Sequence, residues 1–420
     1  MKKRRNASPH SFHGPGNLRY QKGSALLIFV ILAGFGMLTV VLGALDSRRI
    51  KIERDNVTTR ALAQAKAALI AYTLQRGSAA GTARPGEFPC PDTNEDGNEE
   101  TSCTPGQLGR IPWKTLGAPE PIDGDGETLW YAVVDRFRTR PSNNNPINSD
   151  NKPSFLMSVY AADGQTLLTP AGKEAVVVIF SPGAAIGSQT RITGQRNNKT
   201  NYLESAGTLT ARNNATDSGP FISAPKSSTF NDRVMIITRS DFMPALEKRV
   251  AAELLSALQA YKLANGVYPH PASYNDANCI LTTLASSSDA VSSSCVSDTT
   301  KCRGRVPKMV QPADWPAGAL PQWFLDNRWS DVIYYAVGTD FLSGAAASCS
   351  PSLTIDSDTN VEVLFFTPGI PTGSNTRPKT TLTTYLEDSA NQDGWTGSPP
   401  SADVYVTPSS SSNDKLYRLP

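Results

Sequence analysis

The chain repeats the stretch VVVIFSPGAAIGSQTR, residues 176–191, as VEVLFFTPGIPTGSNTR at residues 361–377. Each copy opens with a short apolar run that ends at proline and glycine, which is typical of a buried strand followed by a loop. We therefore expect residues 176–180 and residues 363–366 to form equivalent strands in two related modules.

Six further pairs of short matches keep the same order along the chain, while the spacing between them varies. Insertions in loops change spacing without changing order, so the series predicts two copies of one module. The matched pairs are LIAYTLQRG (69–77) with LQAYKLANG (258–266), FPCP (88–91) with YPHP (268–271), LGRIP (108–112) with RGRVP (303–307), LWYAV (129–133) with IYYAV (333–337), YLES (202–205) with YLED (385–388), and NDRVMIIT (231–238) with ADVYVTP (402–408).

Each module begins with a helical pattern, continues through a long loop rich in Pro, Gly and Cys, and ends in several short strands. Helices are predicted at residues 46–76 and 242–265, with Tyr72 and Tyr261 at equivalent positions and Gly266 as a C-terminal stop. A helix followed by an antiparallel sheet makes an α+β fold. The predicted fold class is therefore α+β, in two tandem modules that each combine a helix with an antiparallel sheet.

One segment of the chain is apolar enough to lie in a membrane. Residues 24–45 contain no charged residue, and as a helix at about 1.5 Å per residue they span about 33 Å, enough to cross a bilayer. Residues 1–23 hold six Lys or Arg and no acid, so this leader is predicted to stay cytoplasmic and the body to lie outside. A secretory signal has a shorter apolar region, whereas here a helical pattern continues to Gly77.

The predicted domain organisation has four parts. The parts are a basic leader (1–23), a transmembrane helix (24–45), a first α+β module (46–240) and a second α+β module (241–420).

The positive charge of the chain belongs to the leader. The whole chain carries a net charge of +2, so the residues beyond the leader carry −4, and no basic surface for nucleic acid is predicted.

The segment QKGSALLIFVIL, residues 21–32, together with the long helix that follows it, resembles the type IV pilin and type II secretion pseudopilin superfamily. The resemblance covers roughly residues 17–76 in motif terms, and the modules match the family's heads in layout only. It implies cleavage by prepilin peptidase between Gly23 and Ser24. It also implies a single-pass anchor in the inner membrane, a periplasmic or extracellular body, and other pilins or pseudopilins as partners.

The chain departs from the family at Ile28, where most members have Glu at the fifth mature position. Absence of that Glu is typical of K-type pseudopilins and of similar minor pilins. A doubled head would also collide with the subunits above it if it were repeated along a shaft. The resemblance therefore implies a minor subunit at the tip or initiation point of a type IV pilus or a type II secretion pseudopilus.

The loop CPDTNEDGNEETSC, residues 90–103, is the strongest candidate for a metal site. Gly97 allows a sharp turn, and oxygen-bearing side chains alternate around it as in the first nine positions of a calcium loop. Cys103 stands at position twelve, where an EF-hand has a bidentate Glu, so a complete EF-hand is excluded. The loop therefore predicts calcium as the one possible cofactor. The alternative interpretation is an acidic, solvated loop that is closed by a disulfide and binds no metal. The candidate ligands are Asp92, Asn94, Asp96, Asn98 and Glu100.

All six cysteines lie beyond the apolar segment, which favours disulfides in an oxidising compartment. Cys90 and Cys103 flank one loop and are predicted to pair. Three connectivities stay open for the other four, which are Cys279, Cys295, Cys302 and Cys349.

The remaining motifs favour structural roles. The SPGAAIGSQT segment lacks the Lys of a phosphate-binding loop, so it is predicted to be a hairpin loop, and Arg191 and Arg377 are expected to bond a carboxylate or a carbonyl. DGDGE at residues 123–127 is more typical of a turn. His270, between two prolines, is predicted to be a loop residue.

The aromatic pairs, Trp130 with Tyr131 and Tyr334 with Tyr335, favour core packing over a binding face, because alternation along a strand turns one side chain of each pair inward. No spacing specifies a Ser/His/Asp, Cys/His or paired-carboxylate site, so the chain is not predicted to be an enzyme. Two alternatives to the pilin-like subunit stay open: an uncleaved membrane-tethered periplasmic binding protein and, third, an exported enzyme.

Overall fold

The computed structural model describes eleven stretches of the chain. They are residues 24–77, 83–139, 146–151, 156–192, 197–206, 211–279, 295–344, 349–372, 377, 381–397 and 402–419.

By its internal contacts the chain divides into two compact units, residues 1–55 and residues 56–420. The described part of the first unit belongs to helix α1 (Ser24–Gln75). No helix in the described stretches combines the length and the apolar character needed to cross a membrane. The predicted leader, residues 1–23, lies outside the described residues.

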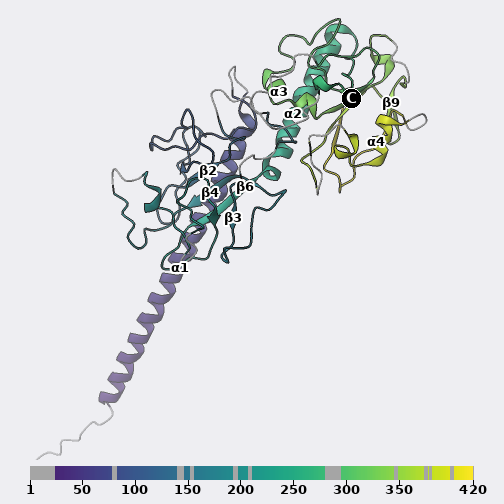
Figure 1. Ribbon diagram of the computed structural model, residues 1–420. Helices are drawn as coiled ribbons and strands as arrows, with labels where there is room; N and C mark the ends of the chain where they lie inside the picture. Colours follow the sequence, from purple (N-terminus) through teal and green to yellow (C-terminus); the bar gives the residue numbers. More distant parts are fainter. Residues whose placement is uncertain are drawn as a thin grey trace, which may run out of the picture. The chain divides into compact units, whose positions relative to one another are not determined.

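The second unit contains two four-stranded antiparallel sheets, and strands of the first lie side by side in Figure 1. The first sheet has the order β1-β2-β4-β6 and the second has the order β7-β8-β11-β13, read from the opposite edge. The strands of the first are β1 (Gly109–Arg110), β2 (Trp130–Val133), β4 (Ala175–Ser181) and β6 (Arg233–Thr238). Those of the second are β7 (Arg303–Arg305), β8 (Tyr334–Val337), β11 (Val363–Thr367) and β13 (Lys415–Arg418).

The two sheets are built in the same way, as the repeated stretches predict. The predicted runs 176–180 and 363–366 lie in β4 and β11, which each occupy the third place of their sheet. The β2–β4 pairing aligns Trp130 with Phe180, and the β8–β11 pairing aligns Tyr334 with Phe366. The α+β class with antiparallel sheets is therefore confirmed.

One predicted match between the modules is wrong. ADVYVTP forms β12 (Val404–Tyr405), which belongs to a different sheet, whereas the partner of β6 is β13. The residues before β13 are Asn413 and Asp414, and they repeat Asn231 and Asp232 before β6. The apolar residues of ADVYVTP made this segment resemble β6. The true equivalent, β13, was missed because it is half-exposed and carries Lys and Arg.

Smaller elements complete the second unit. A parallel pair, β3–β5, and a three-stranded sheet of order β10-β9-β12 are formed by segments that lie in sequence between strands of the main sheets, and short helices lie in the second module. The strands are β3 (Val159–Tyr160), β5 (Phe221–Ile222), β9 (Leu353–Ile355) and β10 (Asp358–Val361), and the helices are α3 (Gln322–Asp326) and α4 (Ser389–Thr396). The 3₁₀ turns are η1 (Lys199–Asn201), η2 (Ala277–Cys279), η3 (Trp329–Asp331), η4 (Thr339–Phe341) and η5 (Leu382–Thr384).

Helix α2 (Arg239–Asn265) begins three residues earlier than the sequence predicts. Thr238 and Asp241 form a capping box, in which the Asp241 carboxylate accepts the Thr238 backbone N–H at 2.7 Å. The helix ends at Gly266, as predicted, because this residue adopts φ 75°, a conformation that glycine tolerates best.

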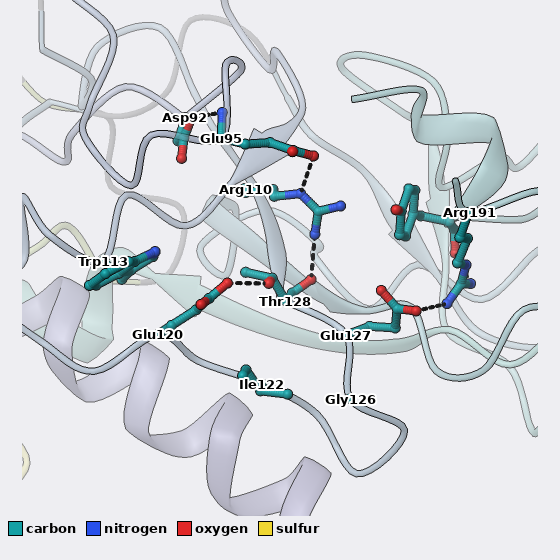
Figure 2. Close-up of a pocket in the computed structure, with 11 residues that line it drawn as sticks. Asp92, Glu95, Arg110, Trp113, Glu120, Ile122, Gly126, Glu127, Thr128 and Arg191 are labelled. Carbon is teal, nitrogen blue, oxygen red and sulfur yellow. Dashed lines mark hydrogen bonds and ion pairs between the residues drawn. The ribbon is translucent and has the colours of Figure 1, made fainter. Parts of the chain in front are cut away.

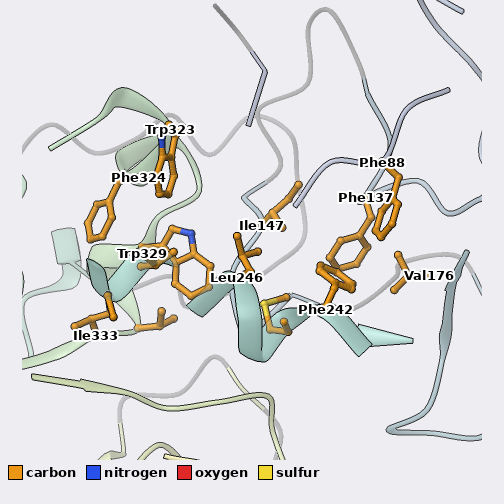
Figure 3. Packing of buried hydrophobic residues seen from close by; sticks show 14 of the residues in the cluster. Phe88, Phe137, Ile147, Val176, Phe242, Leu246, Trp323, Phe324, Trp329 and Ile333 are labelled. Atoms are coloured by element: carbon orange, nitrogen blue, oxygen red, sulfur yellow. The ribbon is translucent and has the colours of Figure 1, made fainter. Parts of the chain in front are cut away.

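One large hydrophobic core runs through both modules (Figure 3), and Ala272, Cys279 and Cys295 form a separate small cluster. Phe242 of α2 packs edge-on against Phe88 at 5.3 Å and against Phe137 at 5.8 Å between ring centroids. Those two rings belong to the first module, whereas α2 continues into the second. Leu62 and Leu69 of α1 are buried in the same core, so this helix contributes apolar side chains to it.

The structure contains three disulfides, and Cys90–Cys103 is the predicted one. Its Cα atoms lie 5.7 Å apart, within the usual range for a disulfide. In the chain-entropy approximation, closing a loop of this length stabilises the fold by about 3 kcal/mol. Of the three open connectivities, the structure selects Cys279–Cys295 with Cys302–Cys349.

Candidate functional site

The predicted calcium loop is held by hydrogen bonds from its own backbone. Asp92 is buried, and its carboxylate accepts the N–H groups of Asn94 at 3.0 Å, Glu95 at 2.7 Å and Gly97 at 2.8 Å. Gly97 adopts φ 81°, and a Cβ there would lie 2.9 Å from the Trp113 ring, so glycine is required at this turn.

The other candidate ligands face neighbouring donors. Asn94 Oδ1 accepts the N–H of Asp96 at 2.9 Å, and Asp96 Oδ1 accepts the N–H of Asn98 at 2.7 Å. This backbone hydrogen bond is the main reason why the pKa of Asp96 is lowered. Glu100 accepts from the Thr93 hydroxyl at 2.8 Å. In the described residues, no three His, Cys, Asp or Glu side chains are grouped as for a metal.

Calcium binding stays a prediction, and its test is thermal. If the loop binds calcium, adding 5 mM calcium chloride to EDTA-treated protein should raise the melting temperature, because a ligand bound only by the folded state stabilises it. Asp96→Asn should remove that rise, since it deletes one charged ligand on the exposed side of the loop. No rise with calcium would assign the loop to the solvated alternative.

The predicted processing residues fall at the edge of the structure. Gly23 lies outside the described residues, and Ser24 is the first residue of α1.

Arg191 and Arg377 make the bonds predicted for them. Arg191 donates to the carbonyl oxygen of Gly183 at 2.5 Å and pairs with Glu127 at 3.1 Å. Arg377 donates to the carbonyl oxygen of Gly369 at 2.6 Å and pairs with Asp150 at 3.5 Å. Arg191 therefore ties the loop after β4 to its own module, whereas Arg377 ties the loop after β11 to Asp150 of the first module.

The aromatic pairs are core residues on both faces of their strands. Tyr131 and Tyr335 are fully buried, and their hydroxyls donate to the carbonyl oxygens of Pro89 and Pro269. His270 is buried as well, with its ring nitrogens 3.0 Å from Lys301 O and 3.1 Å from Ser343 O. These contacts agree with structural roles.

A cavity of about 480 Å³ opens on the first sheet around Arg110 (Figure 2). Arg110 is 7% exposed, and its guanidinium lies 4.9 Å from the Trp130 ring centroid and 4.6 Å from that of Tyr202. Arg191 lies 4.7 Å from the same Tyr202 ring. Both arginines and Tyr202 line the cavity, and so does Trp113.

Carboxylates surround these arginines. Glu95 lies 3.5 Å from Arg110 Nε, and Arg110 Nη1 donates to the Thr128 carbonyl oxygen at 3.3 Å. On the opposite side, the Thr128 hydroxyl donates to Glu120 at 2.6 Å. Figure 2 shows Glu95, Glu120 and Glu127 around the central guanidinium. The described lining carries four carboxylates, two guanidinium groups and one threonine hydroxyl, so it is a polar, charged cavity.

The second module repeats this arrangement around Arg305. The Arg305 guanidinium lies 5.2 Å from the Tyr334 ring and 6.0 Å from the Tyr385 ring, and Arg377 lies 4.9 Å from Tyr385. The Asp92–Arg110 bridge of the first module corresponds to the bridge between Ala272 and Arg305. Arg305, however, is fully buried.

Side chains from elsewhere in the chain fill the second arrangement. The Tyr274 ring lies 5.2 Å from the Arg305 guanidinium. Asp150, from the first module, pairs with Arg377 and accepts the Tyr385 hydroxyl at 2.7 Å. Burial raises the pKa of Asp150, against the opposing effects of Arg377 and Tyr385.

A carboxylate pair before the fourth strand is also repeated in both modules. Asp232 accepts the N–H of Glu204 at 2.9 Å, and Asp414 accepts the N–H of Glu387 at 2.8 Å. Burial raises the pKa of Asp232 well above its ordinary range and raises the pKa of Asp414 to about 7. Because Asp232 and Asp414 each accept a backbone N–H from the loop of the paired glutamate, these pairs hold the loops in place.

Sequence reasoning singled out neither Arg110 nor Tyr202, although both lie in matched stretches. LGRIP and RGRVP share the Arg, and YLES and YLED share the Tyr and Glu. Charged and aromatic residues kept in both copies are the signal that finds these arrangements.

Comparison with known proteins adds no relative to this geometry. The chain matches no protein-family model, no curated protein and no solved structure.

Proposed function

We propose that this protein is a minor pilin-like or pseudopilin-like structural subunit with no catalytic activity of its own. The observation that carries the proposal is the helix α1, which runs from Ser24 to Gln75. Near its start, Val30, Leu32 and Met37 are 64%, 64% and 76% exposed, which is costly in water and favourable in a membrane.

The later part of the helix supports the same proposal. Ala61, Leu62, Ala65 and Leu69 are buried within the first module. A helix with exposed apolar side chains near its start and buried ones in an α+β head further along suits an inner-membrane subunit with its body in the periplasm or outside the cell. The partners would be prepilin peptidase and other pilins or pseudopilins.

Two features favour a tip or initiation position over a shaft position. The head holds two modules with a shared core, so its bulk cannot be reduced by separating them. Ile28 occupies the position of the family's Glu, which is thought to bond the N-terminus of a neighbouring subunit. A first subunit needs no such bond.

A membrane-tethered binding protein is the second candidate, and the cavity around Arg110 favours it. A polar cavity of about 480 Å³ is within the usual size range of ligand sites. The two candidates differ in the processing of the N-terminus.

N-terminal sequencing of the membrane-extracted protein tests the proposal. We expect a chain that starts at Ser24 in cells with prepilin peptidase and a chain that retains the leader in cells without it. Gly23→Leu should block cleavage, whereas the matched control Gly16→Leu should not. A start at Met1 in all these samples would overturn the pilin-like proposal and support the tether. If the mature chain starts at Ser24, immunogold labelling tests the tip position. Gold bound to a tag on the body of the protein should then lie at one end of each filament. Even labelling along the filaments would contradict the tip position.

A further inference from the structure

A groove of about 430 Å³, the α1 groove, lies along helix α1 in the first module. One wall is a face of the helix within residues 61–68, and the other is the loop of residues 111–122. Trp113, Glu120 and Ile122 of this loop also line the polar cavity described above, and Figure 2 shows them. Both walls lie entirely within the described residues.

The α1 groove is apolar except at one edge. Four alanines and Gln64 form the helical wall, and the loop contributes seven apolar residues together with Glu120, the one charged residue of the described lining. Because alanines leave space above the helix, a large apolar side chain of another molecule is able to pack there. Residues 118–127 contain four acids and no base, so a positive charge is favoured at the same edge.

An earlier part of α1 carries a surface with both of these properties. Ile52 is 61% exposed, which is unfavourable for a large apolar side chain in water. Arg48 and Arg49 precede Ile52 by four and three residues, so the three side chains share one face of the helix. Both arginines are exposed as well. This face therefore presents a large apolar side chain with two positive charges on its N-terminal side.

We propose that the α1 groove of one copy of this protein binds the helix face of Arg48, Arg49 and Ile52 of a second copy. Ile52 packs against the alanines of the groove, and the two arginines lie beside Glu120. Ile52 precedes Gln64 by twelve residues, about 18 Å along the same helix, so a chain is unable to fill its own groove. The contact joins two different surfaces, so it is heterologous and shifts one copy along the α1 axis of the other.

Cysteine cross-linking in membranes tests which surfaces meet. All six native cysteines are in disulfides, so an added cysteine supplies the free thiol of each chain. Two full-length copies with different tags are co-expressed, one with Ile52→Cys and the other with Ile122→Cys, and mild oxidation should link them. Ile50→Cys is the matched control, because Ile50 is 55% exposed on the same helix but lies about 200° around its axis from Ile52. This control should give no product with Ile122→Cys. Equal products from the two pairs, or none from either, would overturn the proposal.

Charge reversal tests the role of Glu120. Sedimentation equilibrium of the full chain in a non-ionic detergent should show self-association that Glu120→Lys weakens about tenfold, because an attraction becomes a repulsion. Arg48→Glu together with Arg49→Glu should weaken it as much, and adding Glu120→Lys to this pair should restore it. Asp340→Lys is the control and should change nothing, since this exposed residue lies in the second module and outside the groove. A monomer at every concentration, or no recovery in the combined variant, would overturn the proposal.

This contact is independent of the processing of the N-terminus. It requires α1 and the first module but not cleavage after Gly23, so the present proposal and the pilin-like one fail separately. Two copies joined in this way still give one cap of gold label at a filament end.

Discussion

Replacing Arg377 with methionine should lower the free energy of unfolding by about 3–5 kcal/mol, the usual cost of removing one partner of a buried ion pair. The side chains of Arg377 and Asp150 are 1% and 3% exposed, and their charged atoms lie 3.5 Å apart. Without the guanidinium, the Asp150 carboxylate stays buried with the Tyr385 hydroxyl as its remaining hydrogen-bond donor from a side chain. Urea unfolding followed by fluorescence measures the loss.

The first module provides a matched control. Arg191→Met deletes the equivalent guanidinium and its bond to the Gly183 carbonyl oxygen. Its carboxylate partner, Glu127, is 27% exposed and is able to turn to water, so we expect a smaller loss of about 1–2 kcal/mol.

A second substitution identifies the cause. Adding Asp150→Asn to Arg377→Met should recover part of the lost stability, because the buried negative charge is then gone. If the double variant is no more stable than Arg377→Met, the loss comes from the carbonyl contact of Arg377 rather than from the ion pair.

Glu247→Gln should stabilise the protein increasingly as the pH rises from about 5 to 8. Burial raises the pKa of Glu247 from 4.5 to about 8, although the Arg377 charge acts in the opposite direction. The folded state therefore holds a proton that the unfolded state releases above pH 4.5, and stability falls as the pH rises through this interval. Glutamine has nearly the same shape and does not titrate. At pH 8 the free energy of unfolding of Glu247→Gln should therefore exceed that of the wild type by a few kcal/mol.

Melting curves at pH 5, 6.5 and 8 measure this difference. Glu253→Gln is the control, since Glu253 lies on the same helix with its side chain 38% exposed. We expect its melting temperature to follow the wild type at every pH. A Glu247→Gln difference that is independent of pH would show that packing, and not ionisation, sets the effect.

The sequence predicted the elements whose patterns are local. Strands β4 and β11 are apolar runs between turn residues, and Gly266 ends α2 because of its own backbone freedom. β13 escaped prediction because it is short, half-exposed and charged, so only its pairing with β11 defines it. The disulfide connectivity of the last four cysteines also depends on tertiary contacts.

The candidate site was predicted less completely than the fold. The loop at 90–103 has a recognisable spacing, whereas the Arg110 cavity brings together residues from distant stretches of the first module. Asp150 acts on Arg377 across more than two hundred residues. No local sequence pattern predicts such a contact. Comparison of the two repeats does, however, identify the arginines to examine for one.

The position of Phe242 has a consequence for the history of the chain. If the two modules arose by duplication, each would at first have been able to fold alone. Here a ring at the start of the second copy's helix covers Phe88 and Phe137 of the first, and Asp150 of the first neutralises Arg377 of the second. Each module contributes side chains to the interior of the other, so we expect deletion of one module to destabilise its neighbour.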